Sequence, residues 1–224
     1  MERTIAVLVE AGPDAIQLSP GQAPLLQRLP GRKPALVLRT DVANVYGADA
    51  PRHLFSELVE RAVDRAVALD AACVCVNLLE LPGEPELLRQ CVGNVSRLRA
   101  ACDAAGMPLM VEPLVFKPGA TGYAVNGDPE RIVPLVRQAV ELGADVIKAD
   151  PTDDLADYPR VVEAAAPRPV LVRGGGRVSD DELLARTREV MRAGAAGIVY
   201  GRNVIQHAQP TEIVRRLMEI VHGA

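Results

Sequence analysis

The sequence predicts an α/β protein with the (β/α)8 architecture of a TIM barrel, and three observations lead to this prediction. One local pattern recurs: an amphipathic stretch ends in Gly or another small residue, and a short apolar run follows. Glycine tolerates the left-handed conformation that ends many helices, so each unit reads as a helix followed by a strand. Alternating strands and helices imply a parallel sheet. Finally, the 224 residues are rich in aliphatic side chains without a composition shift, which predicts one domain over residues 1–224.

The pattern places each element in turn. The expected strands lie around residues 15–19, 34–40, 73–79, 108–114, 145–150, 169–174 and 197–201. The expected helices lie near 2–11, 52–69, 84–105, 128–142, 155–165, 180–193 and 210–222. Asp128 before Pro129 and Ser179 before Asp180 have the residue types of helix starts. The Gly- and Pro-rich segment 115–127 is the longest irregular one, and we expect an active-site loop there.

The number of strands is one short of a closed barrel. The chain opens on the helix at 2–11, where an eight-stranded barrel opens on a strand. A seven-stranded parallel barrel would leave an unpaired edge. We therefore expect the first strand to be missing from this chain, or the terminus to compensate in another way; a mis-set start is one explanation.

Lysine is rare in this chain: of the 25 lysine and arginine residues, only Lys33, Lys117 and Lys148 are lysines. Lys148 lies within the apolar run 144–150, which reads as a buried strand. Burial disfavours the ammonium, and a neutral amine attacks a carbonyl carbon to give a Schiff base. Arginine keeps its proton and cannot do this chemistry. Lys148 is therefore the candidate nucleophile; the alternative is a structural ion pair with a neighbouring barrel carboxylate.

The polar strand residues share one face. Successive strand residues alternate between the barrel interior and the helix layer, so the parity that places Lys148 inside also gives an inward set near the strand C-termini. That set comprises Gln17, Ser19, Arg39, Asp41, Asn77, Glu112, Asp150 and Arg173. We expect Glu112 to transfer protons, with a pKa that burial raises toward neutrality. We expect Arg39, Asp41, Asn77 and Arg173 to bind substrate; the alternative is a barrel-filling layer of ion pairs.

Glycine-rich turns follow the last two predicted strands. Loops at these positions of a barrel often bind phosphate through backbone N–H groups, and glycine lets the backbone approach the anion. Arginine adds a charge-assisted fork. The candidate phosphate-binding residues are Gly174, Gly175, Gly176, Arg177, Gly201 and Arg202. The alternative is a pair of tight turns without a ligand.

Composition excludes several function classes. The net charge of −4 and the lack of a basic run argue against nucleic acid as a partner. Neither a signal peptide nor an apolar stretch long enough for a membrane is present, so we expect a cytoplasmic protein. The cysteines, at positions 73, 75, 91 and 102, read as reduced packing residues. The three histidines are scattered, which disfavours a catalytic metal site.

Three segments carry a family resemblance. Residues 141–148 are similar to the strand with the Schiff-base lysine in archaeal-type class I fructose-bisphosphate aldolases. Residues 169–177 resemble that family's phosphate loop after strand seven, and 194–207 resemble its strand-eight signature. The wider group includes the deoxyribose-phosphate and tagatose-bisphosphate type aldolases. The resemblance extends over roughly 106–221. It implies a class I aldolase, without metal, that acts on a phosphorylated ketose such as fructose 1,6-bisphosphate or on dihydroxyacetone phosphate, and that forms homo-oligomers.

The chain departs from the family pattern at two places. The family's first strand ends in Asp-His-Gly, whose aspartate takes part in the chemistry, and this chain begins at the following helix. The family often carries a tyrosine acid/base at the end of strand five, where this chain reads Glu112 to Lys117; Glu112 or Tyr123 is the expected substitute. Two alternatives therefore stay open. One is a transaldolase-like lyase in amino-sugar or aromatic precursor synthesis, and the other is a non-catalytic, truncated phosphosugar-binding barrel.

Overall fold

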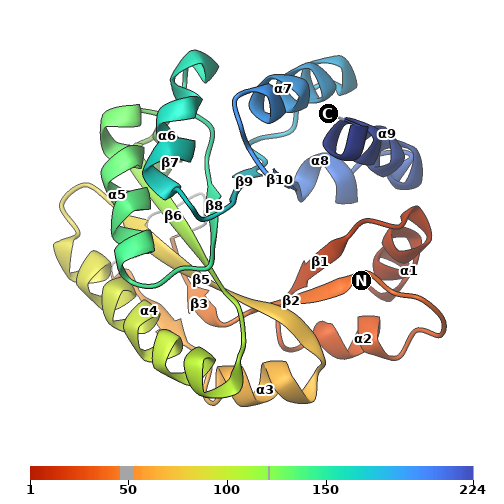
Figure 1. The fold of residues 1–224 in the computed structure, drawn as a ribbon, viewed down its shortest axis with the longest axis horizontal. Helices are drawn as coiled ribbons and strands as arrows, with labels where there is room; N and C mark the ends of the chain where they lie inside the picture. Colours follow the sequence, from red (N-terminus) through yellow and green to blue (C-terminus); the bar gives the residue numbers. More distant parts are fainter. Residues whose placement is uncertain (46–52, 121, 224) are drawn as a thin grey trace.

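The central feature of the protein is a curled parallel sheet with helices around its outer face (Figure 1). The structure is a computed structural model that describes residues 1–45, 53–120 and 122–223. Seven parallel strands follow one another in the order β1-β2-β5-β6-β8-β9-β10, which confirms the predicted barrel class. They are β1 (Ala15–Leu18), β2 (Ala35–Arg39), β5 (Ala71–Glu80), β6 (Leu109–Pro118), β8 (Val146–Ala149), β9 (Val170–Arg173) and β10 (Gly197–Val199).

Two helices begin and two end at the residues whose types predict a cap. Asp128 Oδ1 accepts the N–H of Glu130 at 3.0 Å, and Ser179 Oγ accepts that of Glu182 at 3.3 Å. Gly12 and Gly106 end their helices with φ of 73° and 63°. The helices are α1 (Glu2–Ala11), α2 (Ala23–Gln27), α3 (Ala62–Ala68), α4 (Pro85–Ala105), α5 (Pro129–Glu141), α6 (Tyr158–Ala165, after a 3-10 turn at Leu155–Asp157), α7 (Asp180–Arg192), α8 (Arg202–Ile205) and α9 (Pro210–Gly223). Sequence patterns did not predict α2.

The predicted helix over 52–69 is wrong in its first half. Residue 52 lies outside the described residues, and beyond it the chain forms the strand β4 (Ser56–Leu58), which pairs antiparallel with β3 (Asp41–Ala43). Ser56 Oγ donates to Asp41 Oδ2 at 3.1 Å, a contact that no local pattern reveals. Arg61 has a φ of 51°, so the left-handed region separates β4 from α3, and the helix begins only after it.

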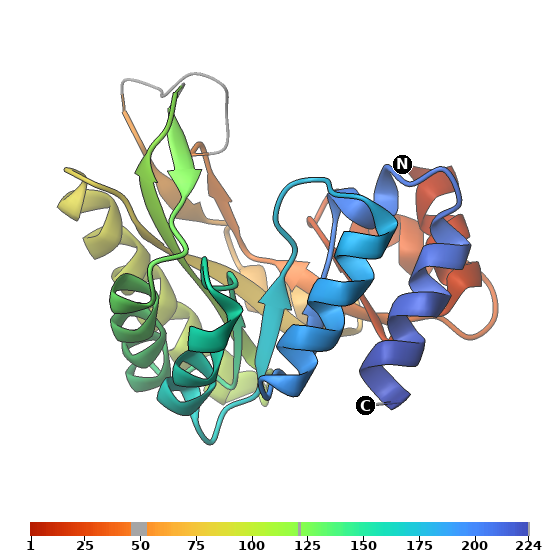
Figure 2. The ribbon, with the colours of Figure 1, turned by 90° about the horizontal axis from the view of Figure 1, so that it is seen from above.

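The segment 115–127, expected to be an irregular loop, is largely a hairpin. Its residue 121 lies outside the described residues. The strand β6 continues to Pro118 and pairs antiparallel with β7 (Tyr123–Val125). Figure 2 shows this hairpin extending past the body of the sheet. The alternating apolar residues on both sides of the Gly-rich turn favour pairing of the two strands. In the sequence the Gly-rich turn is the more obvious signal, so the segment reads as a loop.

Two separate apolar clusters confirm the predicted alternation of the strands. The larger one lies between the sheet and the helices and includes the outward side chains of the strands, such as Ile147 and Ala149. The smaller one fills the barrel interior with the inward side chains Val37, Cys73, Cys75 and Met110, against which Val146 and Leu171 pack. Leu114, which the same parity places inside, belongs instead to the larger cluster. The inner cluster forms an apolar floor beneath the polar residues.

Between β1 and β10 the strand ladder is open. These two are the edge strands of the described sheet, and neither pairs with the other. The helix layer nevertheless continues across this seam, because α1 packs against α9. No helix within the described ranges is both long and apolar enough to cross a membrane. The seam therefore separates two parallel strand edges behind a continuous pair of helices.

Candidate active site

Lys148 lies inside the barrel near the C-terminal end of β8. Its residue is only 6% exposed, while its neighbours Ile147 and Ala149 face the helices and are fully buried. The Nζ atom lies 3.0 Å from Glu112 Oε1 and donates to Gln17 Oε1 at 3.1 Å. The nucleophile predicted from sequence is thus a buried amine between two oxygen acceptors, one from the neighbouring strand β6 and one from the edge strand β1.

Glu112 is the centre of the charged cluster. Besides Lys148, it contacts Arg173, whose Nε lies 3.2 Å from Glu112 Oε1, and Arg39, which donates to Oε2. Burial alone would raise the pKa of Glu112, but the charges of Lys148, Arg39 and Arg173 outweigh it and lower the pKa to about 2. The predicted rise of this pKa toward neutrality is wrong. The sequence pattern predicts that Glu112 is buried. It does not show how close the three cations come, because they lie on three other strands.

A second layer of carboxylates holds the two arginines. Arg39 Nη1 lies 3.2 Å from Asp41 Oδ1, and Arg173 Nη1 lies 2.8 Å from Asp150 Oδ1. Burial raises the pKa of Asp150 above its ordinary value, against the opposing charge of Arg173. The structure therefore brings Arg39, Glu112, Asp150 and Arg173 of the expected inward set together around Lys148, and both arginines have protein partners.

Asp41 links this cluster to the β3–β4 hairpin. Its Oδ2 accepts from the Asn77 backbone N–H at 3.2 Å, from Asn77 Nδ2 at 2.9 Å and from Ser56 Oγ at 3.1 Å. A carboxylate with several donors is well stabilised in a buried place. Asp41 and Asn77, which the sequence predicted to bind substrate, thus bind each other in this structure.

The cluster opens onto a cavity of about 1040 Å³. Its polar wall consists of Gln17, Arg39, Asp41, Asn77, Glu112, Lys148 and Arg173. Its other walls come from β1, β10, the helices α1, α8 and α9 along the seam and the adjoining loops. They are mostly apolar, with the polar residues Thr4, Asp14, Arg202, Gln206 and His222 among them. A space of this size holds a small ligand beside Lys148.

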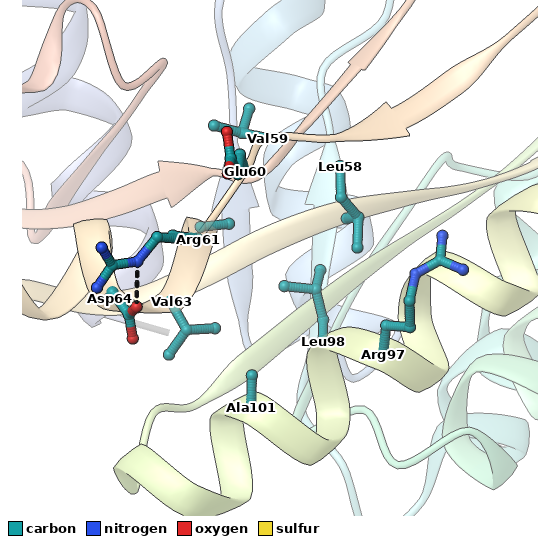
Figure 3. A pocket seen from close by; sticks show the side chains of 10 residues that line it. Leu58, Val59, Glu60, Arg61, Val63, Asp64, Arg97, Leu98 and Ala101 are labelled. Carbon is teal, nitrogen blue, oxygen red and sulfur yellow. Dashed lines mark hydrogen bonds and ion pairs between the residues drawn. The ribbon is translucent and has the colours of Figure 1, made fainter.

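A second, smaller hollow of about 320 Å³ lies elsewhere, between the end of β4, the start of α3 and α4 (Figure 3). The ion pair drawn there joins Arg61 to Asp64 at 2.9 Å, and both side chains are largely exposed. Exposed pairs of this kind contribute little free energy. This hollow lacks the buried convergent charges of the Lys148 cavity, so we place the candidate site at Lys148.

The glycine-rich turns after β9 and β10 lie side by side. Asn203 joins them: its Nδ2 donates to Gly176 O at 3.0 Å and its Oδ1 accepts from Val178 N–H at 3.0 Å. Arg202 Nη2 reaches Gly175 O at 3.3 Å. The predicted phosphate residues are thus one continuous surface, to which Asn203 contributes although sequence reasoning did not single it out. Its position directly after Gly201-Arg202 was the available signal.

Glycine occupies the positions of this surface for different structural reasons. A Cβ at position 174 would lie 2.8 Å from Tyr200 Cδ1, too close to be tolerated without movement. A Cβ at position 176 or 201 would meet open space. Close packing therefore explains Gly174, whereas Gly176 and Gly201 leave open room above the turn. The guanidinium of Arg186 lies next to the turn, with Nη1 at 3.7 Å from a Cβ placed on Gly175.

Tyr123, the alternative substitute for the family's acid/base tyrosine, does not line the Lys148 cavity. It lies on β7 and packs partly buried against the larger apolar cluster. All four cysteines are free and buried. Within the described ranges no three His, Cys, Asp or Glu side chains gather in a way that could hold a metal ion. Among the described residues, the polar side chains that line the cavity are therefore the groups that can contact a ligand beside Lys148.

Comparisons with known proteins agree with this geometry. A family model described as DeoC/LacD family aldolase matches residues 1–207. The chain belongs to this family. This DeoC/LacD member is 27% identical to an archaeal fructose-1,6-bisphosphate aldolase whose structure has the catalytic Lys covalently bound to the carbinolamine intermediate of its substrate. That match has a TM-score of 0.81 and covers 99% of this chain and 84% of the other.

Two further relatives are synthases of amino-containing seven-carbon compounds. The 2-amino-3,7-dideoxy-D-threo-hept-6-ulosonate synthase of Halobacterium salinarum is 32% identical over 99% of this chain and 79% of the relative. The 2-amino-4,5-dihydroxy-6-oxo-7-(phosphonooxy)heptanoate synthase of Streptomyces griseus is 30% identical over 85% of this chain and 66% of the relative. The chain is thus similar to aldolase-type enzymes with different products.

Proposed function

We propose that the chain is a class I aldolase in which Lys148 forms a Schiff base with the ketone of dihydroxyacetone phosphate or a ketose phosphate. The Nζ lone pair forms a bond to the carbonyl carbon while the C=O π pair moves to oxygen, which takes up a proton. Loss of water from this carbinolamine leaves an iminium. In a ketose phosphate the iminium accepts the electron pair of the C–C bond that breaks, while the hydroxyl on the departing carbon loses its proton and becomes the carbonyl of the released aldehyde. The observation that carries the proposal is the buried Lys148 amine at the cavity wall, 3.0 Å from Glu112.

Glu112 has a different role from the proton transfer first expected of it. With a pKa of about 2 it stays ionised at neutral pH and is a weak base. An ionised carboxylate beside Nζ instead stabilises the positive charge of the iminium as it forms. We assign Glu112 this electrostatic role, with Arg39 and Arg173 keeping it in place and keeping it ionised.

The phosphate group is proposed to bind at the turns after β9 and β10. The N–H groups of Gly175, Gly176 and Arg177 donate to no acceptor among the described residues. Open space above Gly176 and Gly201 leaves room for an anion, and the exposed side chains of Arg177 and Arg202 add positive charge. Phosphate held there fixes the position of the ketone relative to Lys148, which is how remote binding accelerates a reaction.

Dihydroxyacetone phosphate is our candidate donor, because two of the relatives are named for compounds that contain its three-carbon unit. The compound in the name of the Streptomyces griseus enzyme has a ketone at carbon 6 and a phosphonooxy group at carbon 7. Its carbons 5 to 7 therefore have the arrangement of dihydroxyacetone phosphate, and its carbons 1 to 4 that of an amino-acid aldehyde. The structural relative is named for fructose 1,6-bisphosphate, which contains the same three-carbon unit. Our first candidate acceptor is glyceraldehyde 3-phosphate.

The second candidate is an amino aldehyde of four carbons as acceptor, favoured by the synthase names at 30% and 32% identity. A panel with dihydroxyacetone phosphate and each aldehyde separates the two. Formation of fructose 1,6-bisphosphate supports the first, and a seven-carbon amino ketone supports the second. Both candidates use the same Schiff base at Lys148.

Borohydride trapping tests the proposal. Incubation with dihydroxyacetone phosphate followed by reduction should add the reduced three-carbon phosphate to Lys148, as peptide mass spectrometry can show. Lys148→Met should abolish the adduct and turnover without unfolding the protein. Lys117→Met is the matched control, because Lys117 is exposed and its Nζ lies 3.8 Å from Asp153 on the surface. A folded wild-type protein that forms no adduct with several ketose phosphates would leave the non-catalytic barrel as the better description.

A further inference from the structure

Gln17 is a polar residue of β1 that the proposed reaction does not yet use. It lines the cavity, and its Oε1 accepts a hydrogen bond from Lys148 Nζ at 3.1 Å across 131 residues of sequence. An amine carries donors here, so the amide oxygen has to face it and the amide nitrogen points elsewhere. That nitrogen donates to no acceptor among the described residues. Among the described residues, the Gln17 side chain therefore makes one hydrogen bond, and its partner is the candidate nucleophile.

The two acceptors around Nζ define a direction for the lone pair. A neutral lysine amine has two N–H bonds and one lone pair besides its bond to Cε. Glu112 Oε1 at 3.0 Å and Gln17 Oε1 at 3.1 Å accept the two N–H bonds, so the remaining tetrahedral direction is left for the lone pair. With Glu112 alone, rotation about the Cε–Nζ bond could place the lone pair in any of several directions.

From this geometry we infer that Gln17 is a positioning residue for Lys148: together with Glu112 it orients the neutral amine so that its lone pair faces the bound carbonyl. This inference rests on the Schiff-base chemistry proposed above. After addition and loss of water, the iminium keeps a single N–H. Glu112 retains it because a carboxylate is the stronger acceptor for a cation, and Gln17 is released. Gln17 thus acts before and during the attack, and it does so by orienting Lys148 rather than by contacting the substrate.

The test compares Gln17→Met, which removes the acceptor at similar length, with wild type by borohydride trapping at increasing dihydroxyacetone phosphate. We expect the limiting rate of adduct formation on Lys148 to fall ~10- to 100-fold, as a misplaced reacting group commonly costs. The half-saturating concentration should change less than about threefold, because remote phosphate contacts, from which Gln17 is separate, set affinity. The matched control is Gln138→Met on the exposed face of α5, where we expect no change.

Gln17→Glu provides a readout that a merely structural residue would not move. The variant keeps an oxygen acceptor and adds a second carboxylate beside Nζ, which favours the protonated amine. The midpoint of the pH profile for adduct formation should then lie ~1 pH unit or more above that of wild type. Above this midpoint the variant should recover most of the limiting rate. An unshifted pH profile in this variant, or an unchanged limiting rate in Gln17→Met, overturns the inference.

A substrate-independent assay separates this inference from the proposed function. Formaldehyde with borohydride methylates lysine amines, and the three lysines give distinguishable peptides, with exposed Lys117 as the internal reference. Slower methylation of Lys148 relative to Lys117 in Gln17→Met supports the positioning role, and an unchanged ratio overturns it. The comparison of methylation rates tests the positioning role even if no sugar phosphate reacts with the wild-type protein. That lack of reaction would refute the proposed function but not the role of Gln17. Thermal melting by circular dichroism verifies that each variant is folded.

Discussion

Replacing Glu112 with Gln removes the single negative charge that three cations share. Its pKa is about 2 in the folded protein against 4.5 ordinarily. At ~1.4 kcal/mol per pKa unit, ionised Glu112 stabilises the fold by about 3 kcal/mol at neutral pH. Removing one partner of a buried ion pair costs ~3–5 kcal/mol in other proteins, which agrees with this magnitude. We therefore expect Glu112→Gln to lower the free energy of unfolding by about 3 kcal/mol at pH 7.

The pH dependence of this loss follows from the sign of the shift. Because the folded pKa is depressed, the stabilisation is fully present above pH 4.5 and disappears as the pH falls toward about 2. Urea denaturation followed by far-ultraviolet circular dichroism at pH 7, 4 and 2.5 would measure it. The difference in the free energy of unfolding between wild type and Glu112→Gln should become smaller as the pH falls.

The surface pair of Glu130 and Arg160 supplies the control for this experiment. The two side chains meet at 2.6 Å but are 71% and 45% exposed. Glu130→Gln should therefore cost less than ~1 kcal/mol at every pH. A loss below ~1 kcal/mol for Glu112→Gln at pH 7, or a loss that stays constant down to pH 2.5, would refute the electrostatic reasoning.

Three further predictions concern packing and burial. Gly174→Ala should lower the melting temperature by several degrees because its Cβ would lie 2.8 Å from Tyr200 Cδ1, whereas Gly176→Ala, with open space around it, should not. Asp41→Ala should destabilise the protein by ~2 kcal/mol in urea denaturation, since it leaves buried donors of β5 and of the hairpin without an acceptor. Burial raises the pKa of the Cys75 thiol to about 11, so iodoacetamide at pH 8 should modify it in urea but not in the native protein, as peptide mass spectrometry can check.

Strand alternation predicted much of the site from sequence. Once Lys148 was placed inside, the period of two residues placed Arg39, Glu112 and Arg173 inside as well, and the structure brings their charges within contact of one another. Strands of a parallel barrel converge at one end, so residues far apart in sequence meet there without any local signal being needed.

Properties that depend on several elements at once could not be predicted in this way. Burial of Glu112 was visible in the sequence, but the sign of its pKa shift depends on how closely three cations approach. The hairpin at β3 and β4 depends on the contact between Asp41 and Ser56 across 15 residues, so the local apolar pattern wrongly indicated a helix. Gln17 was on the inward parity, yet its contact with Lys148 exists only once the sheet has curled.

The seam between β1 and β10 has a consequence for the order of folding. The helices α1 and α9 pack together behind it, and an exposed contact joins α9 to the loop that follows α1. In this contact His222 Nε2 lies 3.0 Å from Asp14 Oδ2, 208 positions apart in sequence. Closing so long a loop costs ~1.7 kcal/mol more in chain entropy than closing one of about 30 residues, typical of neighbouring strand–helix units. This contact therefore forms late and opens early, whereas the central strands remain protected. Since β1 carries Gln17, the wall of the cavity opposite Lys148 is the side that fluctuates, and its amide hydrogens should exchange with solvent faster than those of β6.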